Sequence, residues 1–231
     1  MVILGLDTAT PGVGVAVGAG GQVIGQVQLN RERRHVEHVV PAIDFLCRHL
    51  GHSPSDLVAV AVGIGPGLFT GLRVGVTSAR AIARALRIPV VPVASLDLLA
   101  YGARYADRLV TAVIDARRGE VFSARYRQAP GGIQRLTPYS VGSPGDLVAD
   151  LAASGQEVLL VGDGAWRHRA AFEELERAEI ASPAHSFPSV AGLIELAVSR
   201  YEREEFCSPS EVVPLYIRRS DAEIGWAEGW R

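Results

Sequence analysis

The sequence predicts an α/β protein of two lobes with mixed sheets, and two observations carry this prediction. An apolar strand at residues 2–6 ends at Asp7 and leads into further strands, and the same order of strand, acidic turn and strand returns where residues 109–114 end at Asp115. Between these points strands alternate with amphipathic helices, which favours right-handed crossovers. A chain of 231 residues that is 48% hydrophobic can give each of two lobes its own core.

Local patterns define the elements of the first lobe. Short apolar runs bounded by glycine-rich turns indicate strands, and an apolar period of 3.6 residues indicates helices. Val40 belongs to that period in the first helix, so we expect it to face inward. Ser95 is the expected N-cap of the last helix. The predicted elements are strands at 2–6, 13–17 and 23–29, a helix at 31–50, a strand at 57–62, a helix at 70–86, a strand at 89–93 and a helix at 94–105.

The second lobe is predicted on the same grounds. Its elements are strands at 109–114 and 121–127, a helix at 146–153, a strand at 157–161 and a helix at 166–178, followed by a helix at 188–204. The expected division of the chain is a first lobe at 1–104 that is completed by 188–218, a smaller second lobe at 105–187, and a tail at 219–231.

The composition excludes several kinds of chemistry. All 23 basic residues are arginine, so a Schiff-base lysine, a lysine general base and a P-loop lysine are absent. The formal net charge of -2 gives no overall attraction to nucleic acid, so we expect this chain alone to bind nucleic acid weakly at most. His35 and His38 lie three residues apart, but no motif supplies a third ligand, and we expect no metal site.

The cysteines and the hydropathy pattern bear on location. Cys47 and Cys207 form no C-x-x-C pair, which fits a reducing compartment, and Cys47 falls on the apolar face of a helix as core packing. The N-terminus lacks the pattern of a signal peptide, and no apolar run has the length of a membrane span. We therefore expect a cytoplasmic protein without membrane contact.

A glycine-rich stretch, GIGPGLFTGLRVGVTSARAIARAL at residues 63–86, joins a buried strand to a helix. A P-loop needs Lys and then Ser or Thr after its last glycine, whereas Gly71 is followed by Leu72 and Arg73. A dinucleotide-binding fingerprint needs an acidic residue about twenty positions on, and residues 88–93 contain none. The stretch therefore fits neither nucleotide-binding motif.

Small residues form a stripe along the helix in this stretch. Gly71, Gly75 and Ala79 recur every four residues, with Ser78 beside them, so they share one helical face. Glycine inside a helix costs up to about 1 kcal/mol relative to alanine, which indicates that something approaches the backbone closely. The protein's own sheet and a partner's helix are equally good candidates. If the partner reading holds, Gly75→Leu should abolish pairing and leave the fold largely intact.

The opening strands and their acidic turn resemble the fold of actin, Hsp70 and the sugar kinases, the ASKHA fold. In that fold the first turn carries an Asp-x-Gly phosphate motif, whereas here Ala9 replaces the glycine after Asp7, which predicts a degenerate nucleotide cleft. Satisfying turn backbone groups is an equally good role for these polar residues, and solvated arginines on a hairpin tip are the alternative for the second turn. The candidate cleft or anion residues are Asp7, Thr8, Thr10, Asp115, Arg117, Arg118, Gly162 and Gly164.

Four separated motifs resemble one family across nearly the whole chain. They are GPGLFTGLRVGV in the glycine-rich stretch, RRHVEHVVPAI in the first helix, DARRGEVF at the second acidic turn, and PLYIRR near the end. These motifs resemble the TsaB (YeaZ) family of tRNA threonylcarbamoyladenosine (t6A) biosynthesis proteins. The family usually has Ser where this chain has Leu68.

The resemblance implies a non-catalytic scaffold subunit of two ASKHA-type lobes. It implies pairing with the catalytic paralogue TsaD through helices 36–50 and 70–86, docking of the ATPase TsaE on that pair, and contact with tRNA through the complex. The resemblance implies that the protein requires no cofactor. Weak binding of ATP or ADP in the cleft or at the complex interface stays open. The expected interface residues are His35, Val36, Val39, Ile43, Leu46, Gly67, Phe69, Thr70, Gly71, Arg73, Val74, Gly75, Ser78 and Ala79.

Two other classes of function remain open at this point. The chain could be an ASKHA-type enzyme, an ATPase or a kinase, although Ala9 in the phosphate motif speaks against it. It could also be a self-associating protein, because one apolar helix pair can mate with its own copy when the partner is absent. A peptidase is not supported, since no Ser/His/Asp or metal set can be placed by motif.

Overall fold

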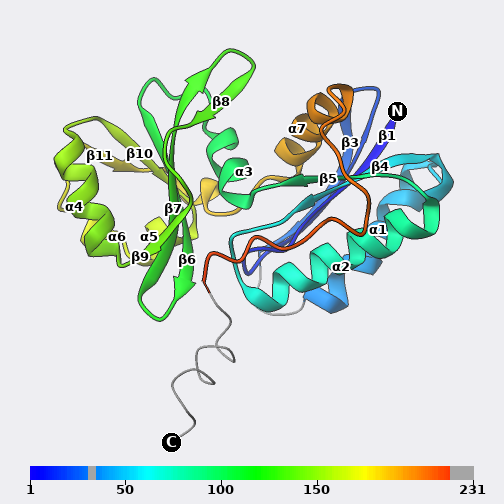
Figure 1. Ribbon diagram of the computed structural model, residues 1–231, viewed down its shortest axis with the longest axis horizontal. Coiled ribbons are helices and arrows are strands. Elements are labelled where there is room, and N and C mark those ends of the chain that lie inside the picture. Colours follow the sequence, from blue (N-terminus) through cyan, green and yellow to red (C-terminus); the bar gives the residue numbers. More distant parts are fainter. Residues whose placement is uncertain (31–34, 219–231) are drawn as a thin grey trace, which may run out of the picture.

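Two lobes lie side by side in the computed structural model, each with a β-sheet flanked by helices (Figure 1). The structure describes residues 1–30 and 35–218, and for residues 35 and 36 the backbone only. Both sheets contain parallel and antiparallel neighbours. The predicted α/β class with mixed sheets is confirmed.

The sheet of the first lobe has the strand order β3-β2-β1-β4-β5. Its strands are β1 (Val2–Asp7), β2 (Val13–Ala19), β3 (Gln22–Leu29), β4 (Leu57–Gly63) and β5 (Val90–Val93). The first three strands form the predicted antiparallel meander, and β4 and β5 add in parallel. Because β1 is central and buried, the acidic turn that follows it lies at the carboxyl edge of the parallel strands, where α/β folds place their ligands.

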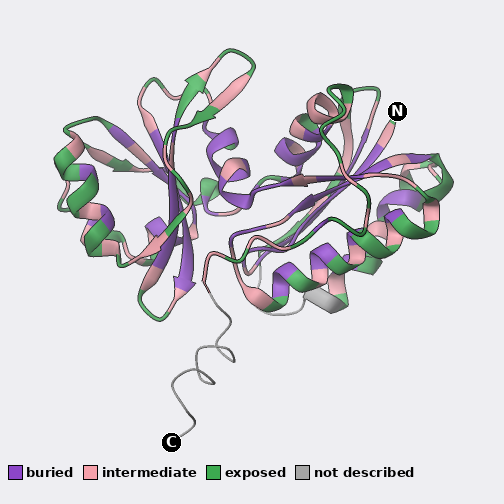
Figure 2. Cartoon of the chain, in the orientation of Figure 1, coloured by how far each residue is buried: buried purple, intermediate pink, exposed green. Residues whose placement is uncertain are grey.

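Helices cover both faces of this sheet. On one face lie α1 (His35–Leu50) and α2 (Phe69–Leu86), and on the other lies α7 (Val190–Glu202) (Figure 1). The burial pattern in Figure 2 shows the sheet as the buried centre, with the outer sides of α1 and α2 exposed. Apolar side chains such as Leu4 and Leu6 pack towards α1 and α2, whereas Ile3 packs towards α7, as the two-residue period of a strand requires.

The sheet of the second lobe has the order β11-β10-β6-β7-β8, with β9 pairing with β7. Its strands are β6 (Leu109–Arg117), β7 (Glu120–Ala129), β8 (Gly132–Arg135), β9 (Ser140–Gly142), β10 (Val158–Val161) and β11 (Ala178–Ile180). Its helices are α4 (Pro144–Ser154), α5 (Asp163–Arg167) and α6 (Arg169–Phe172). Short 3₁₀ helices occupy Pro54–Asp56 in the first lobe and Pro183–His185 in the second.

The helix α3 (Ser95–Gly102) lies between the lobes and belongs to both cores. Leu98 packs in the core of the first lobe, whereas Leu96 and Leu99 pack in that of the second. The segment after α7 also contacts both lobes, because Cys207 bridges to Val90 of β5 and a guanidinium nitrogen of Arg218 lies 2.7 Å from a carboxylate oxygen of Glu120. The lobes are therefore joined by packed elements rather than by a free linker.

Three local expectations were wrong. Val40 faces solvent with 65% of its surface exposed, because α1 presents only part of its apolar stripe to the sheet. Ala94, not Ser95, is the N-cap of α3, and the Ser95 hydroxyl is used elsewhere. The expected helix at 166–178 is broken at His168 into α5 and α6 and ends in strand β11, because β10 pairs with that strand.

Candidate nucleotide cleft and partner surface

The carboxylate of Asp7 is buried at the end of β1 and is occupied by its own chain. One oxygen accepts the Ala9 N–H at 3.2 Å, and the other accepts the Ser95 hydroxyl of α3 at 2.8 Å. Only 3% of Asp7 is exposed, and burial raises its pKa from 3.8 to about 6 against the lowering effect of these hydrogen bonds. A shift of this kind in a turn at a strand end is typical of a ligand site. Here both oxygens already have protein donors.

The glycine-rich loop before α2 lies directly on this first turn. The Leu68 N–H donates to the Ala9 carbonyl at 2.7 Å, and a side chain on Gly67 would overlap that carbonyl. The loop also contacts α3, because the Gly65 carbonyl accepts the Ser95 N–H at 2.7 Å. The loop therefore covers the turn with its tight backbone.

Leu68 is the N-cap residue of α2. Its backbone has the extended conformation of an N-cap, but its side chain makes no capping hydrogen bond. A serine at an N-cap can supply such a bond, because its hydroxyl can accept a free N–H of the first turn. Leu68 therefore leaves α2 without a side-chain cap.

The stripe of small residues on α2 faces the protein's own sheet. The Thr8 hydroxyl donates to the Gly71 carbonyl at 2.7 Å, and a side chain on Gly75 would overlap that hydroxyl. Ala79 is fully buried in the core beneath α2. Of the two readings left open by the sequence, the intramolecular one is therefore correct, and Gly71, Gly75 and Ala79 are not available to a partner. The expectation that Gly75→Leu leaves the fold largely intact depended on the partner reading, so it no longer holds.

The second acidic turn is surrounded by positive charge. The carboxylate of Asp115 is 4% exposed, with guanidinium nitrogens of Arg117 and Arg167 at 3.4 and 3.3 Å and an imidazole nitrogen of His168 at 3.6 Å. The Asp115 N–H donates to Asp163 at 3.1 Å, and burial raises the pKa of Asp163 to about 6. Arg167 and His168 come from α5 and the turn after it, so the sequence pattern around Asp115 did not reveal them.

The remaining cleft candidates divide between packing and surface. Side chains on Gly162 and Gly164 would collide with the backbone of β6, so these glycines bring α5 close to the sheet. Thr10 is buried at the first turn, and Arg118 is exposed at the tip of the β6–β7 hairpin. Gly162 and Gly164 therefore have a packing role.

The interface residues expected from the resemblance do not form one surface. Val39 and Leu46 are buried in the first core, as is the small stripe, whereas Thr70 and Arg73 are exposed. The side chains of His35 and Val36 lie outside the described residues. The half-buried members are Ile43, Gly67, Phe69, Val74 and Ser78. On α1, Val40 and Phe45 are 65% and 51% exposed, and their spacing of five residues places them on different sides of the helix, about 140° apart.

Sequence reasoning missed Val40 and Phe45 as surface residues. Phe45 lies outside the inward period of α1, and a large apolar residue off that period was the available signal. We call Val40, Phe45, Thr70 and Arg73 the outer helix face. At its edge, the Phe69 ring lies against the Arg73 guanidinium, 3.9 Å from the ring centroid, and 5.2 Å from the Tyr216 ring.

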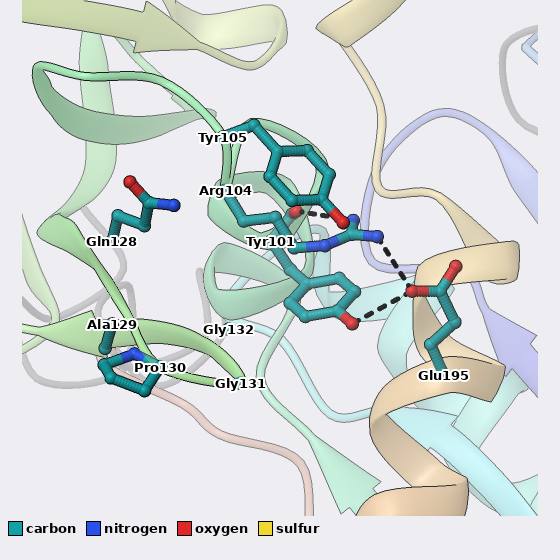
Figure 3. A pocket seen from close by; sticks show the side chains of 9 residues that line it. All are labelled: Tyr101, Arg104, Tyr105, Gln128, Ala129, Pro130, Gly131, Gly132 and Glu195. Carbon is teal, nitrogen blue, oxygen red and sulfur yellow. Dashed lines mark hydrogen bonds and ion pairs between the residues drawn. The ribbon is translucent and has the colours of Figure 1, made fainter.

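A cavity of about 630 Å³ opens between α3, α7 and the β7–β8 turn (Figure 3). Figure 3 shows Arg104 over Tyr101, with both side chains directed to Glu195. Glu195 accepts the Tyr101 hydroxyl at 2.9 Å and an Arg104 nitrogen at 3.0 Å. The charged groups of this cavity thus bind one another and tie α3 to α7.

These features define a class before any comparison. Two lobes, each opening with a strand, an acidic turn and an antiparallel strand, are the ASKHA arrangement, and the covered first turn marks a degenerate member. Among the residues described, no helix combines the length and apolar character needed to cross a membrane.

Comparison with known proteins agrees. A family model described as TsaD, tRNA N6-adenosine threonylcarbamoyltransferase, matches residues 22–226. The tRNA threonylcarbamoyladenosine biosynthesis protein TsaB of Bacillus subtilis is 30% identical over 99% of both chains. The structure of YeaZ from Pseudomonas aeruginosa aligns with a TM-score of 0.82 at 27% identity, over 94% of this chain and 99% of that one.

A more distant likeness shows the fold alone. The activator of 2-hydroxyisocaproyl-CoA dehydratase from Clostridium difficile aligns with a TM-score of 0.50 at 12% identity, over 93% of this chain and 99% of that one. Together with the nearer relatives, this places the chain among the actin-like ATPase folds. The chain belongs to the TsaB (YeaZ) family.

Proposed function

We propose that this protein is a non-catalytic subunit in tRNA threonylcarbamoyladenosine biosynthesis. It pairs with the catalytic paralogue TsaD, and the pair recruits the ATPase TsaE. Family membership supports the pathway, since the relative in Bacillus subtilis carries that function in its name. The observation that carries the non-catalytic part is the Asp7 carboxylate, whose two oxygens are both bound by the protein's own donors.

The occupied first turn argues against a working nucleotide site. In an ASKHA enzyme this carboxylate and the glycine after it must face the ligand. Here the Ala9 carbonyl is bound by Leu68, and Asp7 is bound by Ser95. The second carboxylate, Asp115, is already paired with Arg117 and Arg167. A metal–phosphate group would have to displace several buried hydrogen bonds, each of which is expensive to leave unmade.

The outer helix face supports the pairing. Large apolar side chains that are exposed on helices are typical of protein interfaces. Two helices also offer ridges and grooves for a second pair. Val40 and Phe45 provide the apolar area, and Arg73 provides a planar charged group stacked on Phe69. TsaD therefore binds the outer helix face in this proposal, not the stripe of Gly71, Gly75 and Ala79.

The first experiment is light scattering on a size-exclusion column, with this chain alone and mixed with TsaD of the same organism. The proposal expects a mixed species that forms at the expense of any self-association. It also expects threonylcarbamoylation of tRNA that needs both chains, with no turnover by this chain alone. Persistent homodimers without a mixed species, together with ATP hydrolysis by this chain, would replace the proposal with an ASKHA-type enzyme.

A further inference from the structure

Four arginines form a row along α2 and its C-cap. Arg73, Arg80 and Arg84 are separated by seven and four residues, so at 3.6 residues per turn they fall within about 40° of one another, over about 17 Å of helix. Arg87 follows as the C-cap residue of α2, with a left-handed backbone at φ 57°. The helix from Phe69 to Leu86 contains no Asp or Glu, so it has no i,i+4 partner for any of them.

The last three arginines of the row are exposed and unpaired within the described part of the chain. None of Arg80, Arg84 and Arg87 takes part in the ion pairs found there, although exposed arginines elsewhere do. Arg48, for example, lies 2.8 Å from Asp44. Cations near a helix C-terminus are favoured by its dipole, which accounts for Arg84 in the last turn and Arg87 at the C-cap. Arg80 lies outside that turn, so the dipole does not explain the whole row.

A groove runs beside these three arginines. Its other wall is the segment 206–211, and its volume is about 1080 Å³. The segment is fixed to the first sheet, because Cys207 and Val90 exchange backbone hydrogen bonds at 3.0 Å. Phe206 is 40% exposed on this wall. Glu211 is the acidic residue lining the groove, and its carboxylate accepts the Ser208 N–H at 2.8 Å.

We propose that Arg80, Arg84 and Arg87 form a binding site for the phosphate groups of an RNA strand, which in the pathway proposed above is the tRNA. The inference rests on that proposed function. Arginine binds phosphate through a planar fork of donors. Arg80 and Arg84 share one face of α2, about 6 Å apart along its axis, and Arg87 lies at the C-cap just beyond them. Phosphates repeat along a nucleic acid strand, whereas carboxylates on an acidic peptide have no fixed spacing. The exposed Phe206 ring adds a surface on which a base can stack.

The site explains how a chain of net charge -2 contributes to RNA binding. Three unpaired guanidinium groups at the end of α2 concentrate positive charge locally, although the net charge of the whole chain is negative. Such a short row binds weakly by itself, because affinity for a phosphate backbone grows with the number of contacts. The site leaves out Arg73, which belongs to the outer helix face proposed for TsaD, and acts as one part of a larger tRNA surface in the complex.

The test compares two triple variants of the full chain in complex with TsaD. The row variant is Arg80→Gln, Arg84→Gln and Arg87→Gln. The matched control is Arg127→Gln, Arg169→Gln and Arg177→Gln, three exposed arginines of the second lobe, so that each variant changes the formal net charge from -2 to -5. The probe is a fluorescently labelled, unmodified transcript of a tRNA that reads ANN codons, and anisotropy is measured from about 50 to 200 mM salt.

The row variant should bind the transcript at least about tenfold more weakly, and the slope of log K against log salt should fall by about 2 to 3. The control should keep both values near those of the unaltered chain. A third variant with lysine at the three row positions should retain most of the slope, because the charge persists, and lose part of the affinity with the planar fork.

Three results would overturn the inference: unchanged binding by the row variant, equal losses in both glutamine variants, or a polyglutamate peptide that competes with the transcript at equal charge. Each variant is also mixed with TsaD on the size-exclusion column. Normal pairing with unchanged tRNA binding rejects the arginine row alone. Failure of the unaltered chain to pair with TsaD rejects the proposed function itself.

Discussion

The hydroxyl of Thr8 occupies the space in which a side chain on Gly75 would lie, and it donates a hydrogen bond to the Gly71 carbonyl one turn earlier. Helix α2 thus sits on the first acidic turn with no room between the two backbones. This contact joins the two features that the sequence marks most clearly, the acidic turn after β1 and the glycines of α2. It also determines what a substitution at Gly75 will do.

Gly75→Ala should destabilise the protein itself. The added methyl group overlaps the Thr8 hydroxyl, and overpacking of this kind costs about 1 to 3 kcal/mol in spite of the better helix propensity of alanine. Urea unfolding measures the change. The control is Gly102→Ala near the end of α3, where nothing lies within 4 Å of the added methyl, so its midpoint should stay or rise slightly.

A double variant identifies the cause. If Thr8 is the obstacle, Thr8→Ala combined with Gly75→Ala should lose less stability than the sum of the two single variants, by at least about 0.5 kcal/mol. Additive losses would show that the overlap lies elsewhere. A folded, stable Gly75→Leu protein that fails to bind TsaD would return the glycine stripe to the partner interface.

The stability of the protein should fall as the pH rises from about 4 to 6. Burial raises the pKa of Asp7 from 3.8 to about 6, so the folded state holds its proton over a range in which the unfolded chain has lost it. This contribution is fully present below the unfolded pKa and lost as pH passes through the folded one. For a shift of this size it amounts to about 3 kcal/mol. Asp163, with a pKa also raised to about 6, adds to the same slope.

Asp7→Asn tests whether Asp7 causes this dependence of stability on pH. The amide can still accept the Ala9 N–H but has no charge to bury, so the variant should be more stable than the unaltered chain at pH 7.5 and similar to it near pH 4. Unfolding in urea across this range gives the two curves. Asp150→Asn, at an exposed position of α4, serves as the control and should leave the slope unchanged. An unaltered slope in the Asp7 variant would mean that its carboxylate is charged in the folded state.

Val40→Asp and Phe45→Asp should weaken pairing with TsaD without unfolding the protein. Each places a charge on the outer helix face, and a tenfold loss of affinity corresponds to about 1.4 kcal/mol. Both side chains are more than half exposed, so stability should change by no more than about 0.5 kcal/mol. Titration calorimetry with TsaD measures the affinity.

Leu136→Asp is the matched control, because Leu136 is 43% exposed on the second lobe. It should pair with TsaD as the unaltered chain does. Equal losses from all three variants would point to a general effect of charge, and full affinity in the α1 variants would exclude this face from the interface.

Asp97→Ala should loosen the junction between α3 and the second sheet. The Asp97 carboxylate accepts the hydroxyls of Tyr126 and Tyr139, both at 2.9 Å, and the Tyr126 side chain is fully buried. The carboxylate and burial together raise the pKa of both tyrosines, so they remain donors. Loss of the acceptor leaves the Tyr126 hydroxyl buried and unpaired, which costs about 1 to 3 kcal/mol.

Tyr126→Phe in the Asp97→Ala background provides the check. It removes the unpaired hydroxyl and should recover part of the lost stability, whereas Tyr126→Phe in the unaltered chain should be destabilising. Urea unfolding of the four proteins completes the cycle. No recovery in the double variant would mean that Tyr126 finds another partner once Asp97 is removed.

Much of the fold can be read from local patterns. The central strands β1, β4 and β6 are mainly apolar runs, and turns mark their ends. The two acidic turns stand out because a charged residue ends each of two buried strands. The helix at 166–178 could not be read this way, because its last residues pair with β10, and strand pairing depends on the neighbour rather than on the segment.

The sequence predicted which residues of the two turns belong to the candidate site, but not which groups bind them. Asp7, Thr8, Asp115 and Arg117 are named by position within the two turns, and the structure places them there. The partners that decide their chemistry come from distant segments. Ser95 reaches Asp7 across 88 positions, and Arg167 reaches Asp115 from α5, so no local pattern contains either contact.

The sequence by itself determined the two-lobed class, the absence of lysine chemistry and the family motifs, because these depend on composition and local order. Only the tertiary structure decided that the glycine stripe faces Thr8, that Val40 faces solvent and that the Asp7 carboxylate accepts a hydrogen bond from Ser95. A helical period states which residues share a face, and it carries no information about what lies against that face. That choice depends on how elements far apart in the chain pack together.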